Sequence, residues 1–238
     1  TNPLFAQSER GKISPELLEK TFNLGVSSIS NSRLEDAISY FKQAIQMNPN
    51  DAEAYFRLGW VYGELGQYND AIEAHKKAIQ IKPDDPEAYH ILGLDYVALG
   101  RYNEATEALK KAVEVKPDYA EAYYLLGRVF IDLGKYNEAI EAHKKAIKNK
   151  PDHIEANSNL GAIYYKLGRY KEALEAYQQL IRIKPDYPPA QFGLGAAYEK
   201  LGSNKETIEA YEKAIQLNPN YTEAHLKLGL LYGNLGRH

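Results

Sequence analysis

The sequence predicts an all-α fold, a solenoid of stacked antiparallel helix pairs. Three observations predict it: proline recurs at a constant interval, apolar residues recur between the prolines at helical spacing, and a glycine divides each interval into two helices. The prolines lie 34 residues apart, at Pro49, Pro83, Pro117, Pro151, Pro185 and Pro219. A fixed period of this length is typical of repeat proteins, in which each unit buries its apolar face against its neighbours.

The second copy shows how the two helices are encoded. Tyr55, Leu58 and Tyr62 have the i, i+3, i+7 spacing that places side chains on one face of a helix. Gly66 follows, where the end of a helix needs a residue that tolerates the left-handed conformation. A second helix with similar periodicity then runs to Pro83, which cannot continue it.

Six full copies and one further first helix follow a segment, residues 1–13, that we expect to be flexible. We expect residues 14–238 to form a single right-handed solenoid with thirteen helices. Its helix pairs are predicted at 18–51, 52–85, 86–119, 120–153, 154–187 and 188–221, and its terminal helix at 222–238. The first copy departs most from the pattern, with Thr21, Ser28 and Ser32 replacing two aromatic residues and the turn glycine. Terminal repeats are commonly atypical because they have a neighbour on one side only.

The sequence also predicts which residues cap the starts of the helices and which allow paired helices to approach closely. Asp118 with Glu121, and Asp152 with Glu155, match capping boxes, in which two side chains bond to the exposed backbone at the start of a helix. Glycines of the first helices are expected where paired helices approach most closely, opposite alanines of the second helices. These glycines are Gly59, Gly93, Gly127, Gly161 and Gly195.

One copy, from residue 118 to residue 151, carries the repeated pattern most completely. In order, its residues are Tyr123, Leu126, Gly127, Phe130, Gly134, Tyr136, Ala139, His143, Ala146 and Pro151. This pattern closely resembles the tetratricopeptide repeat (TPR). The resemblance implies a right-handed superhelix with a concave groove lined by the first helices. It also implies a non-catalytic interaction scaffold that binds other proteins.

Composition argues against several classes of partner. The chain has 238 residues and a formal net charge of −3, which argues against a general nucleic-acid surface. No apolar run approaches the length of a membrane-spanning helix. We therefore expect a protein or peptide partner, with no nucleic acid and no membrane insertion.

The sequence predicts no catalytic residue, no cofactor and no bound metal. Cysteine is absent, which excludes thiolate chemistry, and no two of the six histidines have the i, i+4 spacing of a helical metal motif. His75 and His143 occupy the repeat position of Phe41, Tyr177 and Tyr211, so we expect them to be packed core residues. Phosphate-binding glycine loops and strained serine elbows are also absent from the sequence.

The predicted partner-binding site consists of first-helix positions that the repeat pattern does not reserve for packing. The first four copies place large side chains there: Phe22, Phe56, Trp60, His90, Leu94, Tyr124 and Arg128. We see no packing reason for aromatic residues at these positions, and concentrated apolar surface marks interaction sites. We expect them to bind a peptide or helix with apolar anchors and basic flanks. Replacing Trp60 should then cost little stability.

Two ligand-binding subtypes of the family are not matched. The chaperone-binding members hold a carboxylate with a clamp of Lys, Asn and Arg, of which only Arg128 and Asn159 have counterparts here. The asparagine ladder of the glycosyltransferase-associated members is absent. Two alternatives to a free-standing scaffold stay open. The chain could be the recognition arm of a larger enzyme that continues past His238, or a self-assembling scaffold.

The N-terminal segment is a candidate ligand for the groove. Pro3, Leu4 and Phe5 are apolar and lie outside the repeats, so we expect that they can bind the groove of the same or a neighbouring molecule. A tail with no binding role is the alternative. Leu4 to Gln7 also loosely resembles the end of a secretory signal peptide, which would indicate export. Without that signal, the default expectation is a cytoplasmic protein.

Overall fold

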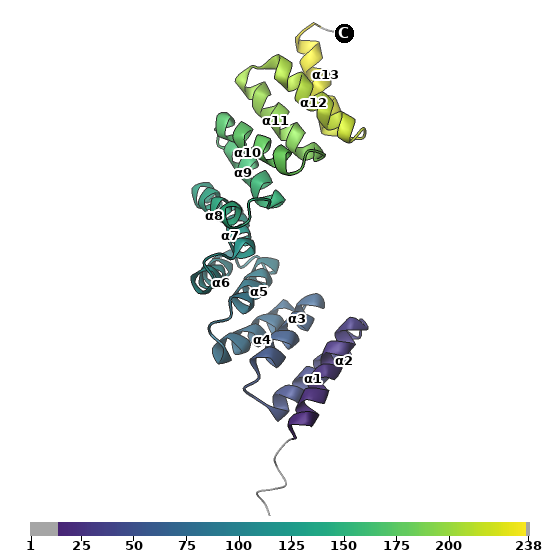
Figure 1. The fold of residues 1–238 in the computed structure, drawn as a ribbon, viewed down its shortest axis with the longest axis vertical. Helices are drawn as coiled ribbons and strands as arrows, with labels where there is room; N and C mark the ends of the chain where they lie inside the picture. Colours follow the sequence, from purple (N-terminus) through teal and green to yellow (C-terminus); the bar gives the residue numbers. More distant parts are fainter. Residues whose placement is uncertain (1–13, 237–238) are drawn as a thin grey trace, which may run out of the picture. The chain divides into compact units, whose positions relative to one another are not determined.

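The computed structural model describes residues 14–236, and these residues form only α-helices and their connecting turns (Figure 1). Thirteen helices lie in this part of the chain: α1 (Pro15–Ser30), α2 (Leu34–Met47), α3 (Ala52–Glu64), α4 (Tyr68–Ile81), α5 (Pro86–Ala98), α6 (Tyr102–Val115), α7 (Ala120–Asp132), α8 (Tyr136–Asn149), α9 (Ile154–Lys166), α10 (Tyr170–Ile183), α11 (Pro188–Leu201), α12 (Asn204–Leu217) and α13 (Thr222–Asn234). The predicted all-α fold is confirmed. Each copy from the second onward begins at the first residue of a helix, as expected. The N-terminal segment and its predicted binding role lie outside the described residues.

The helices belong to two compact units, Thr1–Pro117 and Asp118–His238. In the first unit, α1 pairs with α2, α3 with α4 and α5 with α6, while α2 packs on α3 and α4 packs on α5. The second unit repeats this order from α7 to α12, and α13 packs on α12. First helices also contact one another, α3 with α5 and α9 with α11. The organisation of residues 14–238 as one solenoid stays a prediction.

Left-handed residues follow the first helices, as predicted. The φ angles are 72° at Gly66, 69° at Gly100, 71° at Gly134, 73° at Gly168, 78° at Gly202 and 65° at Gly236. Ser32 has the corresponding place in the first copy, with φ 58°. An L side chain is strained in this conformation, so glycine allows the chain to reverse at little cost. None of the described helices is long and apolar enough to cross a membrane.

The helix starts differ from the predicted capping boxes. Three N-cap side chains accept backbone N–H bonds: Asp51 from Ala54, Asp85 from Glu87 and Ala88, and His153 from Ala156. The boxes predicted at Asp118 and Asp152 are wrong, because α7 and α9 begin one residue later than those boxes require. Tyr119 is therefore the N-cap of α7 and provides no side-chain cap. Packing of the helix pair, rather than capping, must hold this helix start in place.

A large side chain of the second helix packs directly on a glycine of the first helix. A Cβ atom on Gly127 would lie 2.6 Å from the His143 ring, and one on Gly161 would lie 2.8 Å from the Tyr177 ring. The other pairs are Phe41 on Gly25, His75 on Gly59, Leu109 on Gly93 and Tyr211 on Gly195. The glycines therefore lie at close contacts of the paired helices, as expected, and the nearest side chain is the one between the two alanines. His75 and His143 are fully buried, which confirms them as core residues.

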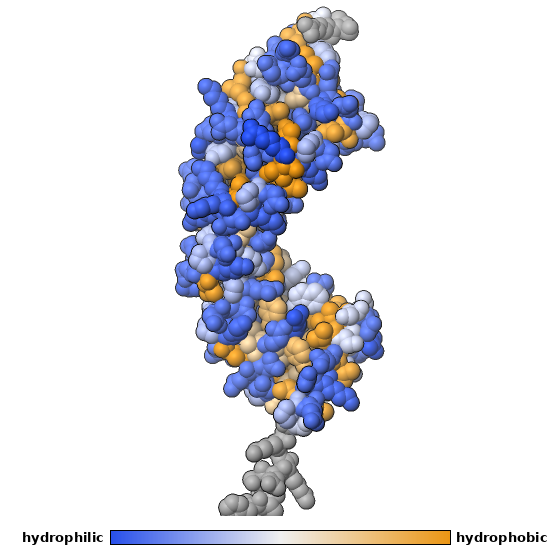
Figure 2. Space-filling view, viewed as in Figure 1, coloured by the Kyte–Doolittle hydropathy of each residue, from blue (hydrophilic) through white to orange (hydrophobic). Residues whose placement is uncertain are grey.

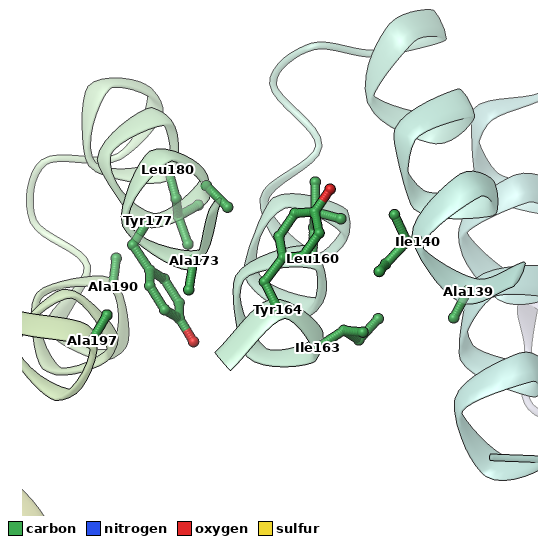
Figure 3. Close-up of a cluster of buried hydrophobic side chains, with 11 residues drawn as sticks. Ala139, Ile140, Leu160, Ile163, Tyr164, Ala173, Tyr177, Leu180, Ala190 and Ala197 are labelled. Atoms are coloured by element: carbon green, nitrogen blue, oxygen red, sulfur yellow. The ribbon is translucent and has the colours of Figure 1, made fainter. Parts of the chain in front are cut away.

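Figure 3 shows the same packing in the core between α8 and α11. The Tyr177 ring extends from α10 towards Ala190 and Ala197 of α11, where alanine leaves room for it. Leu160 and Tyr164 of α9 lie in the same cluster. Burial raises the pKa of Tyr177 to about 12, so its hydroxyl stays neutral in ordinary buffers. The cluster thus joins four consecutive helices of the second unit, α8 to α11, through apolar contacts.

The glycine contact predicts opposite effects for two alanine substitutions at one repeat position. Gly161→Ala should destabilise the protein by about 1–2 kcal/mol, because a methyl group here would overlap the buried Tyr177 ring. Gly229→Ala in α13 should instead stabilise it by up to about 1 kcal/mol, since no other side chain of residues 14–236 lies within 4 Å of the added Cβ and alanine favours a helix. Urea denaturation of both variants tests this pair. Equal effects would show that the glycine contact is not tight.

Candidate partner-binding site

The predicted site residues lie on the first helix of each copy, in both units. In the first unit, Phe22 lies on α1, Phe56 and Trp60 on α3, and His90 and Leu94 on α5. In the second unit, Tyr124 and Arg128 lie on α7. All the aromatic members are half-buried, whereas Leu94 and Arg128 are exposed. Figure 2 shows apolar areas on the mainly hydrophilic surface of each unit.

The aromatic site residues also belong to the packing of the helix pairs. The Phe22 ring lies 5.6 Å from that of Phe41, and the Phe56 ring lies 5.5 Å from that of His75. These distances, measured between ring centroids, are typical of favourable aromatic pairs. The expectation that packing gives no reason for aromatic residues here is therefore wrong. Each of these two rings therefore contacts the core residue of its own repeat and is half-buried.

Trp60 is likewise a packing residue. It is half-buried and lies against the cluster formed by Ala37, Phe41, Leu58, Val61 and Ala74. Burial of an indole ring contributes substantially to stability. The expectation that Trp60 can be replaced with little loss of stability is therefore wrong. Substitutions that test binding must be made at more exposed positions.

A cavity of about 380 Å³ lies between α3, the start of α4 and α5. We call it the Trp60 cavity. Its lining includes Trp60, Gly63, Glu64, Tyr68, Leu94 and Asp95. It therefore brings together two of the predicted site residues, Trp60 and Leu94. Phe56 lines a smaller cavity of about 260 Å³ between α3, the end of α4 and α5. His90 lies half-buried on α5 and is not among the residues that line either cavity.

A buried acid–histidine pair forms part of the wall of the Trp60 cavity. Asp95 Oδ2 lies 2.6 Å from His75 Nδ1, and the two residues are 5% and 0% exposed. A hydrogen bond is needed here because a buried carboxylate without a partner is very costly. The other ring nitrogen, Nε2, has no hydrogen-bond partner among the described residues and faces Gly59, whose Cβ would lie 2.5 Å away. The ring is thus closed off from solvent and cannot serve as an accessible base.

In the second unit, Tyr124 and Arg128 belong to a cluster of rings and cationic groups. The Tyr124 ring lies 4.7 Å from the His153 ring and 5.8 Å from the His143 ring. The Arg128 guanidinium carbon lies 6.0 Å from the centre of the Tyr124 ring. Burial, aided by the charges of His153 and Arg128, lowers the pKa of His143 to about 4. His143 is therefore neutral near pH 7, and neither of its ring nitrogens has a partner among the described residues.

The comparisons with known proteins agree with this geometry. A tetratricopeptide repeat model matches residues 28–94, and a TPR repeat model matches residues 127–168, 163–202 and 200–236. A model of anaphase-promoting complex, cyclosome, subunit 3 matches residues 67–146. A crystal structure of MamA is 32% identical, with a TM-score of 0.66, over 68% of this chain and 95% of that chain.

The chain belongs to the tetratricopeptide repeat family.

Other TPR-like structures share the fold at lower identity. YrrB, described as a TPR protein with an unusual peptide-binding site, is 24% identical over 79% of this chain and 97% of that chain, with a TM-score of 0.69. PilF of Pseudomonas aeruginosa is 18% identical over 90% of this chain and 97% of that chain, with a TM-score of 0.70. These two likenesses show the fold alone. No curated protein matches the sequence.

Sequence reasoning about the TPR copies missed Asp95 and Gly63. A signal was present, because the copies can be compared with one another at each position. The position of Asp95 carries an apolar residue in the neighbouring copies: Val61, Val129, Ile163 and Ala197. An acid at a buried apolar position is a costly exception. Asp95 was not included in the predicted site because that site was chosen only from positions that the TPR pattern leaves outside the core.

Proposed function

We propose that this TPR chain is a non-catalytic scaffold that binds a segment of a partner protein on its first-helix face. The observation that carries the proposal is the Trp60 cavity, in which Trp60 and Leu94 meet. Binding sites for side chains are concave, mainly apolar and equipped with a few polar groups, as this cavity is. The fold shared with YrrB supports a peptide as the ligand, since YrrB is described as having a peptide-binding site.

The partner is proposed to be a protein segment with periodic apolar side chains. Phe56, Trp60 and Leu94 lie on two neighbouring first helices, so they offer successive contacts to one extended peptide or one helix. In the second unit, Tyr124 and Arg128 offer an aromatic face and a cation. Aromatic and arginine side chains are frequent hot spots of protein interfaces. A nucleic acid fits less well, because the formal net charge of the chain is −3.

Absence of catalysis is part of this proposal. Among the described residues, no group of three or more His, Cys, Asp or Glu side chains could hold a metal ion. The one buried acid–histidine pair, Asp95 with His75, packs its free ring nitrogen against Gly59 rather than towards a substrate site. TPR proteins in general act as scaffolds. These features support a binding role for the pair rather than general-base chemistry.

Selection of peptides from a random twelve-residue library on the purified protein tests the proposed function. The selected peptides should change the fluorescence of Trp60, which is the one tryptophan of the chain. Leu94→Ser should weaken their binding about tenfold, because it removes an apolar contact at the cavity. Leu94 is 39% exposed, so the fold should tolerate the change.

Leu201→Ser is the matched control, since Leu201 is also 39% exposed but lies on α11 in the second unit. It should leave both the affinity and the Trp60 fluorescence change unaltered. Selected peptides that bind the Leu94→Ser variant with wild-type affinity would place the binding surface elsewhere and contradict the proposal.

A further inference from the structure

The Trp60 cavity has acidic groups and neither lysine nor arginine in its lining. Glu64 of α3 and Asp95 of α5 contribute the acids. The remaining lining is histidine, glycine, alanine and apolar or aromatic side chains, including Trp60 and Tyr68. A cation beside an aromatic face and a poorly solvated carboxylate is stabilised by both. The charge and the walls of this cavity are thus complementary to one kind of protein side chain, a basic one.

The carboxylate of Asp95 retains unused hydrogen-bonding capacity. One of its oxygens, Oδ2, is bonded to His75 Nδ1, and among the described residues no other side chain is bonded to this carboxylate. The other oxygen, Oδ1, lies 3.5 Å from the place that a Cβ on Gly63 would occupy. An ionised carboxylate can accept several hydrogen bonds, including a pair from one guanidinium group. Gly63 and Asp95 both line the cavity, so Oδ1 lies beside a stretch of cavity wall that carries no side chain.

Three exceptions to the repeat pattern meet at this cavity. The position of Gly63 carries a large side chain in the next copies: Val97, Ile131 and Tyr165. The position of Trp60 is smaller in the later copies of the second unit, where it carries Ala162 and Ala196. Asp95 stands where the neighbouring copies carry Val61, Val129, Ile163 and Ala197. No other pair of neighbouring copies combines these three residues, so the TPR fold does not require the combination. Their meeting at one cavity indicates a ligand.

We propose that the Trp60 cavity binds a basic side chain, arginine or lysine, of the partner segment. Asp95 accepts hydrogen bonds from the cationic head, His75 holds Asp95 in position, and Trp60 packs on the alkyl stem. This inference rests on the proposed function and names the residue that anchors the partner. It also predicts that binding weakens with salt, since part of the attraction is between charges.

Four short peptides test the inference on the wild-type protein. They have the form acetyl-Gly-Leu-X-Leu-Gly-amide, with arginine, lysine, citrulline or norleucine at X. Citrulline keeps the shape of arginine without its charge, and norleucine keeps an apolar stem. Titration followed by Trp60 fluorescence should show that the two basic peptides bind at least about tenfold more tightly than their neutral counterparts.

Variants then assign the preference to Asp95 and Gly63. Asp95→Asn should reduce the preference for the basic peptides to less than about twofold. Asp95→Ile should do the same. This variant should fold, because the same combination occurs in the second unit. There, Ile163 lies in the copy that follows the fully buried His143, just as Asp95 lies in the copy that follows His75. Gly63→Ile should block the cavity and abolish binding of all four peptides, and it reproduces Ile131 of the fourth copy.

The control for Gly63→Ile is Gly233→Ile, at the same repeat position in α13, where no other side chain of the described part of the chain lies within 4 Å of an added Cβ. It should leave binding unchanged. Equal affinity for the arginine and norleucine peptides, with a normal Trp60 response, would overturn the basic anchor but leave the proposed function intact. No Trp60 response to any of the four would also overturn it. The proposed function is judged separately, by whether library-selected peptides depend on Leu94.

Discussion

Tyr211→Ala is expected to lower the free energy of unfolding by about 4 kcal/mol, the largest effect of any substitution considered for this chain. Tyr211 of α12 is fully buried, and its ring packs on Gly195 and lies 5.5 Å from the Phe192 ring of α11. Its hydroxyl donates to Glu199 Oε2 at 2.6 Å, and Glu199 also accepts from Lys227 of α13. Alanine would leave a cavity and remove one link of this network.

Tyr211→Phe separates the ring from the hydroxyl. It should cost about 1.5 kcal/mol, since it removes one hydrogen bond to a charged group and keeps the packing. Tyr177→Phe at the equivalent position should cost less than about 0.5 kcal/mol, because no hydrogen bond of the Tyr177 hydroxyl is present among the described residues. Chemical denaturation of the three variants measures all of these changes. Equal costs for the two Phe variants would show that the bond to Glu199 adds nothing to stability.

Acid is expected to destabilise the protein through His143, by about 3 kcal/mol between pH 7 and pH 4. The folded protein holds the pKa of this histidine at about 4, whereas in the unfolded chain it has its ordinary value near 6.5. Between these values the unfolded chain binds a proton that the folded protein excludes. Stability is therefore fully present above pH 6.5 and is lost as the pH falls towards 4.

His143→Tyr is the control for this titration, because tyrosine fills the same position as Tyr177 and Tyr211. The nearest cations, His153 and Arg128, stay in place, so the comparison reports His143 itself. Urea denaturation at pH 7.5 and pH 4.5 should show that the variant loses about 2 kcal/mol less stability than the wild type. If the wild type and the variant lose the same free energy of unfolding between these pH values, His143 has an ordinary pKa in the folded protein.

The fold could be predicted from the sequence because its determinants are local and repeated. Each copy carries its own helix period, its own left-handed glycine such as Gly66, and its own proline stop. The burial of His75 and His143 followed from the aromatic residues at their repeat position. The capping boxes at Asp118 and Asp152 were wrong because α7 and α9 begin at Ala120 and Ile154, so that Tyr119 and His153 are the N-caps in place of the aspartates.

The candidate site could be predicted only in part. The first-helix positions were identified from the TPR pattern, and Trp60 and Leu94 do meet at a cavity. The pattern could not show that Phe56 and Trp60 also pack against core residues, because that depends on how far each ring reaches across its helix pair. Nor could it show the bond between His75 and Asp95, which joins two copies across a helix interface. Such contacts between copies require three-dimensional coordinates.

The missing side chain at Gly63 indicates how a repeat protein can gain new binding specificities. A new specificity pocket can arise in one copy by loss of a side chain, because the neighbouring copies pack only on that copy and keep their own contacts. The mutational path is short, since a single change between glycine and a larger residue opens or fills the pocket without disturbing the helix register. Duplication supplies spare copies in which this change can be tried. Selection can thus act on one repeat as an independent receptor while the remaining repeats preserve the scaffold.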